Sequence, residues 1–500
     1  MQLLADIAQG FAALGTLATW LALIAGALLG IVVGVLPGVG PGVMIAILLP
    51  FTYGMAPLTG VCLLLGIYCG AFYGGAVTSI LVRTPGEASS IMTMLDGHPM
   101  ARRGEAARAL SLAFMSAFAG GIVSAVLLGV AARPLAALAS RFGAAETAMA
   151  IIIAGICVAF AYRRQFPAAM MMMGLGFFAT IIGIDPNSNE LRYTFGQTGL
   201  LNGLPLVPVA VGLFGAAQAL VMLSSPRSAM PQQALGGARL SLAGFREALT
   251  HHQAMAKGLG LGTLIGVLPA VGAALSTSLA WFWARRGSRD PQSFGQGNPE
   301  GIVAAESANS SNSGGAMITV LALGIPGDAI TAIIMGVFIV HGIAPGPSLY
   351  TDKPELVNGI FVGLLMLNVL ILACLVALVR PLARLAHVDP RQLALGILAL
   401  SFVGAYTAAN STYYLWIMLA AAVFGWLCAR AHLPTIPLIL GMVMGDTLEA
   451  ALRQALTISD GSLAIFVTRP GAALMLAIAV IAAGVALFGL FRARARRANT

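Results

Sequence analysis

The sequence predicts an all-α polytopic membrane protein, and three observations lead to this fold class. Hydrophobic residues make up 59% of the 500 residues and charged residues only 9%, whereas an ordinary soluble protein is about 25% charged. The mean hydropathy is +0.91. Apolar runs recur at lengths that suit membrane-spanning helices of about 20 residues, which leaves room for about 10–13 spans. We therefore expect a multi-pass protein with almost the whole chain in its membrane domain.

Six apolar runs are long enough to predict individual spans. They lie at residues 109–132, 146–161, 199–223, 356–379, 412–428 and 471–491. One polar stretch, GIDPNSNELRYTFG at 183–196, separates two of these runs and is expected to be an exposed loop.

The positive charge predicts an orientation in the membrane. The net charge of +9 comes mostly from arginines in short loops and near the C-terminal end, and basic loops beside apolar spans follow the positive-inside rule. The loop 101–108, the polar stretch after residue 223 and the tail 492–497 are therefore expected on the cytoplasmic side. The same pattern argues against nucleic-acid binding. No basic leader with a cleavage site opens the chain, so the N-terminus is expected to be retained.

Two pairs of similar segments indicate an internal duplication. GVLPGVG at 34–40 returns as GVLPAVG at 266–272, about half the chain later. GGAVTSILVRTPGEA at 74–88 resembles GGAMITVLALGIPGDA at 314–329, with one residue inserted. Matched segments half a chain apart are typical of transporters built from two repeats.

The duplication divides the chain into domains. The first transmembrane repeat is expected over residues 1–223 and the second over 258–491. A polar, basic linker at 224–257 joins them and is expected to be cytoplasmic. A basic tail follows at 492–500.

Each repeat begins with an interrupted helix, at 34–50 and at 266–278. Proline removes a helical hydrogen bond and glycine accepts positive φ, so each segment is expected to form a broken or re-entrant helix. The free N–H groups and the dipole end at such a break can hold an anion without a buried arginine, and the second break adds the hydroxyls of Ser276 and Thr277. The alternative is that these glycines and prolines only serve helix packing.

A polar cluster in the second half suggests a cation site. If residues 301–313 form a helix, Glu306, Asn309, Ser310 and Ser313 lie on one face. Acids at membrane depth usually mark an ion or proton path, and a carboxylate with amide and hydroxyl oxygens suits a sodium ion or a proton. The alternative is a loop helix outside the bilayer.

Glu87 and Asp328 occupy matching places directly after the two Pro-Gly pairs. An acid there either caps the following helix or coordinates the cation, and the sequence leaves both roles open. Arg83 is near enough in sequence to pair with Glu87 or to meet an anion. It has no counterpart in the second repeat.

Seven ordered blocks resemble the large permease subunit of the tripartite tricarboxylate transporters, the TctA family. The blocks run from GVLPGVGPG through ILVRTPGEASS, DGHPMARRGEAARAL, GIDP with RYTFG, GNPEGIVAAESAN, LALGIPGD with GIAPGP, to GDTLEAALRQAL at 445–456.

The resemblance implies a three-part secondary transporter in the bacterial inner membrane. Its partners would be a small membrane subunit and a periplasmic binding protein that delivers a carboxylate. A sodium or proton gradient would drive uptake, and the absence of a P-loop motif agrees with transport that does not use ATP. No cofactor is expected besides the coupling ion, because the five cysteines lack the spacing of metal ligands.

The family motifs and the two interrupted helices together give the candidate site residues. Those expected to bind substrate are Pro37, Gly38, Val39, Gly40, Pro85, Gly86, Pro269, Ala270, Gly272, Ser276, Thr277, Pro326 and Gly327. Those expected to couple the cation are Glu87, Glu306, Asn309 and Asp328. The family usually has glycine where this chain has Ala270, and often paired asparagines where it has Ser310 and Ser311, so the ligand can differ from citrate.

The expected mechanism is alternating access, elevator-like, with the two breaks carrying the anion. One alternative is a stand-alone carboxylate symporter or exchanger that needs no binding protein. A second is a polytopic membrane enzyme, against which stands the absence of HExxH and GxSxG motifs. We therefore expect a transporter and not an enzyme.

Overall fold

The computed structural model describes residues 2–36, 38–162, 165–185, 187–224, 240–269, 271–385, 388–408, 410–481 and 484. Pro37, Ala270, residues 225–239 of the expected linker and the tail 492–500 lie outside the described residues. What the sequence predicts for them stays a prediction.

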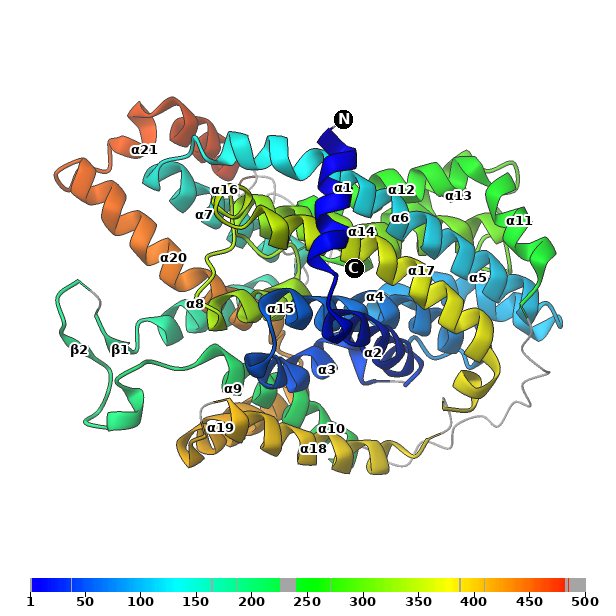
Figure 1. Ribbon diagram of the computed structural model, residues 1–500, viewed down its shortest axis with the longest axis horizontal. Helices are drawn as coiled ribbons and strands as arrows, with labels where there is room; N and C mark the ends of the chain where they lie inside the picture. Colours follow the sequence, from blue (N-terminus) through cyan, green and yellow to red (C-terminus); the bar gives the residue numbers. More distant parts are fainter. Residues whose placement is uncertain are drawn as a thin grey trace, which may run out of the picture.

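The described chain is built almost entirely of helices, which confirms the all-α fold class (Figure 1). The helices of the first half are α1 (Gln2–Ala13), α2 (Leu17–Val35), α3 (Gly40–Leu48), α4 (Pro57–Leu81), α5 (Ile91–Arg102), α6 (Ala106–Ala139), α7 (Ala144–Ala161), α8 (Phe166–Thr180), α9 (Leu206–Ala210) and α10 (Ala217–Ser224). Those of the second half are α11 (Leu242–Thr250), α12 (His252–Val267), α13 (Ala273–Gly287), α14 (Pro299–Leu323), α15 (Ala329–Val340), α16 (Leu349–Asp352), α17 (Pro354–Leu385), α18 (Pro390–Thr407), α19 (Thr412–Arg430), α20 (Ile436–Ile458) and α21 (Ile465–Thr468).

Short elements connect these helices. The 3₁₀ turns are η1 (Leu49–Gly54), η2 (Ala88–Ser90) and η4 (Thr198–Leu200), and a π-helical turn, η5 (Val211–Ala216), joins α9 to α10. The strands β1 (Gly183–Ile184) and β2 (Leu191–Arg192) pair antiparallel, with Gly183 opposite Arg192. They form a hairpin that projects from one end of the molecule in Figure 1.

Six helical segments in the described chain are long and apolar enough to cross a membrane, which supports a multi-pass membrane protein. They are Leu17–Val35, Pro57–Leu81, Ala106–Ala139, Leu206–Ser224, Pro354–Leu382 and Thr412–Arg430. The run expected over 199–223 begins as a helix only at Leu206, because turns occupy the preceding residues. Shorter apolar helices, among them Phe166–Thr180 and Pro470–Ile481, accompany the six.

Glycines let α2 and α4 pack backbone against backbone. A Cβ on Gly26 would meet the Leu63 carbonyl oxygen at 2.3 Å, and one on Gly34 would meet that of Ala71 at the same distance. Gly30 lies between them, and a Cβ there would likewise meet the Gly66 carbonyl oxygen at 2.6 Å. Glycines therefore recur every four residues, the small-residue spacing of tightly packed membrane helices. Because residue numbers rise together along both helices, α2 and α4 run parallel.

The second half repeats this contact between α12 and α14. A Cβ on Gly262 would lie 2.4 Å from the Ala308 carbonyl oxygen, and one on Gly266 would lie 2.5 Å from that of Asn312. These helices also run parallel. Since α3 and α13 must then return toward the start of α4 and α14, α2–α3 and α12–α13 are helical hairpins, each turning at one of the predicted interruptions.

The two longest helices, α6 and α17, pack antiparallel. Gly121 of α6 faces the Asn368 side chain, and Gly129 faces Phe361, so the numbers rise in opposite directions. At one end of this pair Asp6 accepts a hydrogen bond from Arg133 at 2.9 Å. At the other end α6 begins beside Arg103 and Arg108.

A second group of helices packs beside the group formed by α2, α4, α6, α12, α14 and α17. Here α8 packs on α20, α19 on η5, α7 on α20 and α10 on α18. The helices α3 and α15 connect the groups, because α3 contacts η5 and α18 while α15 contacts α20 and α9.

Replacing Gly262 with alanine should lower the stability of the protein by about 1–3 kcal/mol, since the new methyl group overlaps the backbone of α14. Gly260 is the matched control, because a Cβ there meets nothing within 4 Å. Gly260→Ala should be neutral or stabilising by up to about 1 kcal/mol. Thermal unfolding of the detergent-solubilised variants measures the difference, and equal midpoints would show that the contact does not constrain α12.

Candidate functional site

The two interrupted helices break where the sequence predicts. In the first, α2 ends at Val35, Gly38 and Gly40 have φ of 82° and 54°, and α3 begins at Gly40. In the second, α12 ends at Val267 and Gly272 has φ of 76° before α13 begins. Such positive φ values favour glycine. We call residues 36–40 the first tip and 268–272 the second tip.

Both returning helices begin without a side-chain cap. The N-cap residues of α3 and α13 are Val39 and Gly272, which have no side-chain acceptor for the N–H groups of the first turn. The N–H groups of a helical first turn have no partner within the helix. Each tip therefore offers backbone donors and the positive end of a helix dipole to an anion.

The hydroxyls near the second tip are already in use as donors. Ser276 donates to the Ala273 carbonyl oxygen at 2.8 Å, and Thr277 donates to that of Ala274 at 3.1 Å. The donors of this tip that have no partner in the helix are thus its backbone N–H groups.

The Pro-Gly turns that follow α4 and α14 pack against their own halves. A Cβ on Gly86 would lie 2.1 Å from the Gly34 carbonyl oxygen, and one on Gly327 would lie 2.5 Å from the Ala316 Cα. Only glycine fits at these positions. The first Pro-Gly turn, residues 85–87, therefore lies against the end of α2.

The helix that follows each tip packs on an element that follows the Pro-Gly turn of the other half. The first tip leads into α3, which packs on α15, the helix that follows Asp328. The second tip leads into α13, which packs on η2, directly after Glu87. The expected substrate-binding segments of the two halves are thus linked through the helices that follow them.

The predicted helix over 301–313 is confirmed, and it lies inside the protein. It belongs to α14, in which every residue from Gly301 to Ala322 is buried. Glu306 is 0% exposed. The protein therefore encloses Glu306, whereas the Glu300 side chain, at the start of α14, keeps 30% of its surface exposed. Burial by protein leaves open the alternative of a loop helix outside the bilayer.

Glu306 has one hydrogen-bonded oxygen and one without a partner. The Thr93 hydroxyl of α5 donates to its Oε1. Its Oε2 is buried and has no hydrogen-bond partner. Four further buried polar side chains nearby in the sequence or on η2 also have unpartnered atoms: Ser90, Asn309, Ser310 and Asn312.

Glu87 belongs to the same cluster. The Ser89 hydroxyl donates to its Oε1. Its carboxyl interacts with the Asn309 side chain and electrostatically with Glu306 and Asp328. The Asn309 side chain also interacts with Glu306. The Glu87 side chain does not cap the helical turn that follows it. Of the two roles that the sequence left open, capping is therefore excluded for Glu87.

Asp328 does cap its helix. Its Oδ1 accepts from the backbone N–H and the hydroxyl of Thr331, both at 2.8 Å, which completes a capping box on α15. Its Oδ2 accepts from the Tyr68 hydroxyl at 2.5 Å. Both carboxylate oxygens of Asp328 are therefore satisfied by the protein.

The acids are not arranged as a multivalent metal centre. In the part of the chain that the structure describes, no group of three or more His, Cys, Asp or Glu side chains has the spacing to hold a metal ion. Arg83 is exposed and has φ of 58°, and the structure shows no ion pair between it and Glu87.

A carboxylate in a ring of donors fixes α5 beside this cluster. Asp96 is 0% exposed. Its Oδ1 accepts from the backbone N–H groups of Gly295, Gly297 and Asn298 at 2.7–3.1 Å, and its Oδ2 accepts from the Trp281 indole at 2.7 Å. Asp96 thus joins α5 to α13 and to the start of α14.

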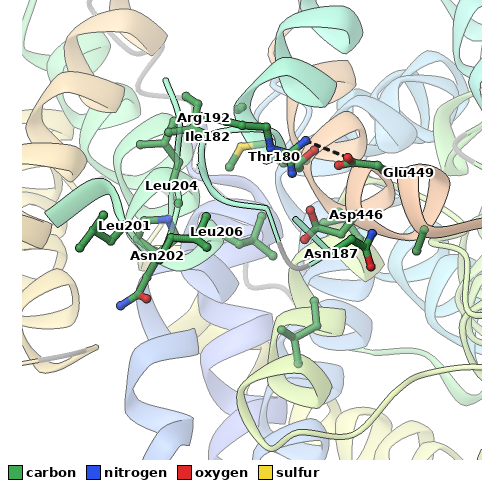
Figure 2. Close-up of a pocket in the computed structure, with 18 of the residues that line it drawn as sticks. Thr180, Ile182, Asn187, Arg192, Leu201, Asn202, Leu204, Leu206, Asp446 and Glu449 are labelled. Carbon is green, nitrogen blue, oxygen red and sulfur yellow. Dashed lines mark hydrogen bonds and ion pairs between the residues drawn. The ribbon is translucent and has the colours of Figure 1, made fainter. Parts of the chain in front are cut away.

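The prediction that residues 183–196 form an exposed loop is partly wrong. Asp185 and Arg192 of this stretch form ion pairs with Arg453 and Glu449 of α20, and we call these four residues the clamp. Asp185 is only 4% exposed and accepts from Arg453 at 2.8 Å. Arg192 donates to Glu449 at 2.8 Å (Figure 2). The backbone N–H of Asn187, aided by Ser188 and the two arginines, holds the pKa of the Asp185 carboxyl below its usual range.

The clamp borders a cavity of about 680 Å³ between the hairpin, α8, α9 and α20. Figure 2 shows Asp446 and Asn187 on one side of it and Leu201, Leu204 and Leu206 on the other. A smaller cavity of about 420 Å³ lies near the first tip, where Gln218, in its wall, donates to the Gly38 carbonyl oxygen at 2.6 Å.

Reasoning from the sequence missed several of these residues. Tyr68 donates to Asp328 and Thr93 to Glu306, each from another helix. Arg453 reaches Asp185 from more than half the chain away. One signal was present: Asp96, Arg453 and Glu449 are charged residues inside two of the resemblance blocks.

Comparisons with known proteins agree with the resemblance. The model of the tripartite tricarboxylate transporter TctA family matches residues 20–440. The chain is 35% identical over 497 residues to an uncharacterized 52.8 kDa protein in the TAR-I ttuC′ 3′ region of Agrobacterium vitis, over 99% of this chain and 98% of the relative. It is 32% identical over 233 residues to an uncharacterized protein in the TAR-II ttuC′ 3′ region of the same organism, over 47% of this chain and 96% of the relative. No solved structure matches.

Replacing Asp96 with alanine should lower the stability of the protein by at least about 2 kcal/mol, because it leaves four donors without their acceptor, and those of Asn298 and Trp281 are buried. The matched control is Asp290→Ala, since Asp290 is exposed in the loop after α13. Thermal unfolding measures both variants. A midpoint for Asp96→Ala equal to that of the control would contradict the anchoring role.

Proposed function

Because this chain belongs to the TctA family of tripartite tricarboxylate transporters, we propose that it is the permease that carries a small carboxylate through the membrane in a three-part, cation-driven uptake system. Its partners are a small membrane subunit and a periplasmic binding protein. The observation that supports this best is the pair of uncapped helix N-termini at the two tips. Two such ends can bind carboxylate groups through backbone N–H donors.

The two halves are inverted repeats in this proposal. Support comes from corresponding helices: α2 with α4 and α12 with α14 make the same glycine contacts, and α6 runs antiparallel to α17. In an inverted pair the two hairpins enter the membrane from opposite sides. The additional helix Pro470–Ile481 then allows both the linker and the tail to be cytoplasmic.

The arginines give the orientation of the proposed transporter. Arg102, Arg103, Arg108, Arg285 and Arg286 gather near the beginnings of α6 and α14, and by the positive-inside rule this end is cytoplasmic in the bacterial inner membrane. The hairpin of β1 and β2 is then periplasmic, since α8 leads away from the basic residues before it.

An elevator-like motion fits the division into two helix groups. The hairpins, α4, α6, α14 and α17 form one group, and α7–α10 with α18–α20 form the other. The tips and the acid cluster belong to the first group. Movement of the first group against the second exposes the tips to either side of the membrane, while Glu87, Glu306 and Asn309 couple a cation to the anion.

Replacing Gly272 with alanine should reduce carboxylate uptake about tenfold or more, because a side chain at positive φ distorts the second tip by an energy of that order. Gly342→Ala is the matched control, since Gly342 also has positive φ and open space but lies at the end of α15. Uptake of labelled citrate or another carboxylate by proteoliposomes of the assembled system measures the effect. Equal uptake in both variants would remove the second tip from the site.

Uptake should also require the periplasmic binding protein. Proteoliposomes that contain this chain and the small membrane subunit are expected to take up the carboxylate only when the loaded binding protein is added outside. Equal uptake without it would favour the stand-alone symporter.

A further inference from the structure

One side chain from the second group of helices is bonded to the first tip. Gln218 of α10 donates from its side-chain Nε2 to the Gly38 carbonyl oxygen at 2.6 Å. Among the described residues other than the chain neighbours of Gly38, this nitrogen is the only atom within 4 Å of where a Gly38 Cβ would be, at 3.7 Å. The Cβ positions of Gly40 and Gly42 meet nothing within 4 Å. Gln218 therefore contacts the tip where its glycines otherwise face open space.

The π-helical turn η5 sets the direction in which Gln218 points. It ends at Ala216, two residues before Gln218. A π turn holds one residue more than an α-helical turn, and each residue of an α-helix is rotated by about 100° from the one before it. Without the added residue, a different side chain of α10 would face the first tip.

Two glycines hold η5 between α19 and α3. A Cβ on Gly212 would lie 2.3 Å from the Met418 carbonyl oxygen of α19, and one on Gly215 would lie 2.9 Å from Ile47 Cγ1 of α3. The helix α3 begins at the first tip. Backbone packing on both sides of η5 thus fixes where Gln218 stands relative to the tip.

The second tip has no such hydrogen bond in the residues that the structure describes. Its Gly272 also has positive φ, 76°, and a Cβ there meets nothing within 4 Å. A bond from the Thr319 hydroxyl of α14 reaches the Val267 carbonyl oxygen, but Val267 ends α12 before the tip. The bond from Gln218 therefore distinguishes the first tip from the second.

The orientation of the Gly38 carbonyl group matters because it adjoins the donors proposed to bind carboxylate. Glycine adopts conformations that other residues avoid, so an unbonded Gly38 carbonyl would be free to turn toward the anion, which its oxygen repels. It would also be able to accept from the N–H of Gly42, four residues on, as in a continuous helix. That bond would occupy one donor of the first turn. The hydrogen bond from Gln218 prevents both.

We infer that Gln218 is a positioning residue for the first tip: its amide holds the Gly38 carbonyl oxygen at α10 and so keeps the N–H donors at the start of α3 available to a carboxylate. This inference deepens the proposed function and rests on it for the nature of the anion. It also makes the two tips unequal, because a residue of the second group of helices acts on the first tip.

Hydrogen exchange tests the position of the tip without transport. Wild type is compared with Gln218→Met, which keeps the length of the side chain and removes its donor, in the full chain in lipid nanodiscs. The amides of residues 36–40 should exchange about two- to tenfold faster, the effect of losing one hydrogen bond, while residues 268–272 stay unchanged. If Gln218→Met does not fold, Gln218→Glu replaces it, since it keeps the shape and also lacks the donor.

The matched control is Gln165→Met. Gln165 lies in the wall of the same cavity as Gln218, and its side chain is not bonded to the tip. Exchange at residues 36–40 in this variant should equal that of wild type. Equal exchange there in wild type and Gln218→Met, or equal acceleration in both variants, would overturn the inference.

Carboxylate affinity separates positioning from a merely structural role. Thermal unfolding midpoints of the purified chain are measured against the concentration of citrate, succinate and benzoate, which gives an apparent Kd for each. Gln218→Met should raise the Kd about two- to tenfold, and Gln218→Lys, which restores a donor, should bring it back. A fold that is only weakened would unfold at a lower midpoint with the same Kd. An unchanged Kd in Gln218→Met would contradict the positioning role.

The two measurements separate this inference from the proposed function. Faster exchange in Gln218→Met, in a chain whose wild type binds none of the three carboxylates and takes none up in the assembled system, refutes the proposed function and leaves the hydrogen bond to the tip. Uptake by wild type, with exchange and affinity unchanged in Gln218→Met, refutes the inference and leaves the proposed function.

Discussion

The close approach of glycine backbones between α2 and α4, and between α12 and α14, is the contact on which the rest of the structure depends. Lipid offers no hydrogen-bond partners to an open backbone, so a re-entrant hairpin must lie against protein along its length. Gly34 and Gly266 bring the C-terminal ends of α2 and α12 against α4 and α14, just before each tip. Gly86 then seats the first Pro-Gly turn on the same place. A larger residue at these positions would move the tip away from the cluster.

This packing explains how the sites arise without buried basic residues. The tips present helix N-termini that no side chain caps, and backbone N–H donors are suited to carboxylates. Beside them, α14 keeps an acid and an asparagine with unused bonding capacity. The uncapped N-termini and the buried polar side chains of α14 are therefore both products of the same helix packing.

The two Pro-Gly turns are followed by acids whose surroundings differ. Asp328 is fully hydrogen-bonded, whereas the matching Glu87 faces Asn309 and Glu306. Side chains from other helices thus decide which partners each of the two acids has. The charged clamp of Asp185, Arg192, Glu449 and Arg453 is also confined to one end of the molecule, where it holds the hairpin against α20.

The sequence by itself determined the fold class, the two helix breaks, the helical face of Glu306 and Asn309, and the family, because hydropathy, glycine and proline placement, and ordered motifs are local properties of the chain. Only the tertiary structure decided the partners. It placed Thr93 on Glu306, Tyr68 on Asp328, and Trp281 with a loop backbone on Asp96. It also separated the capping role of Asp328 from the open position of Glu87, which sequence alone had left equivalent. These contacts join residues up to 260 positions apart, and no local pattern specifies which helices meet when glycine backbones pack together.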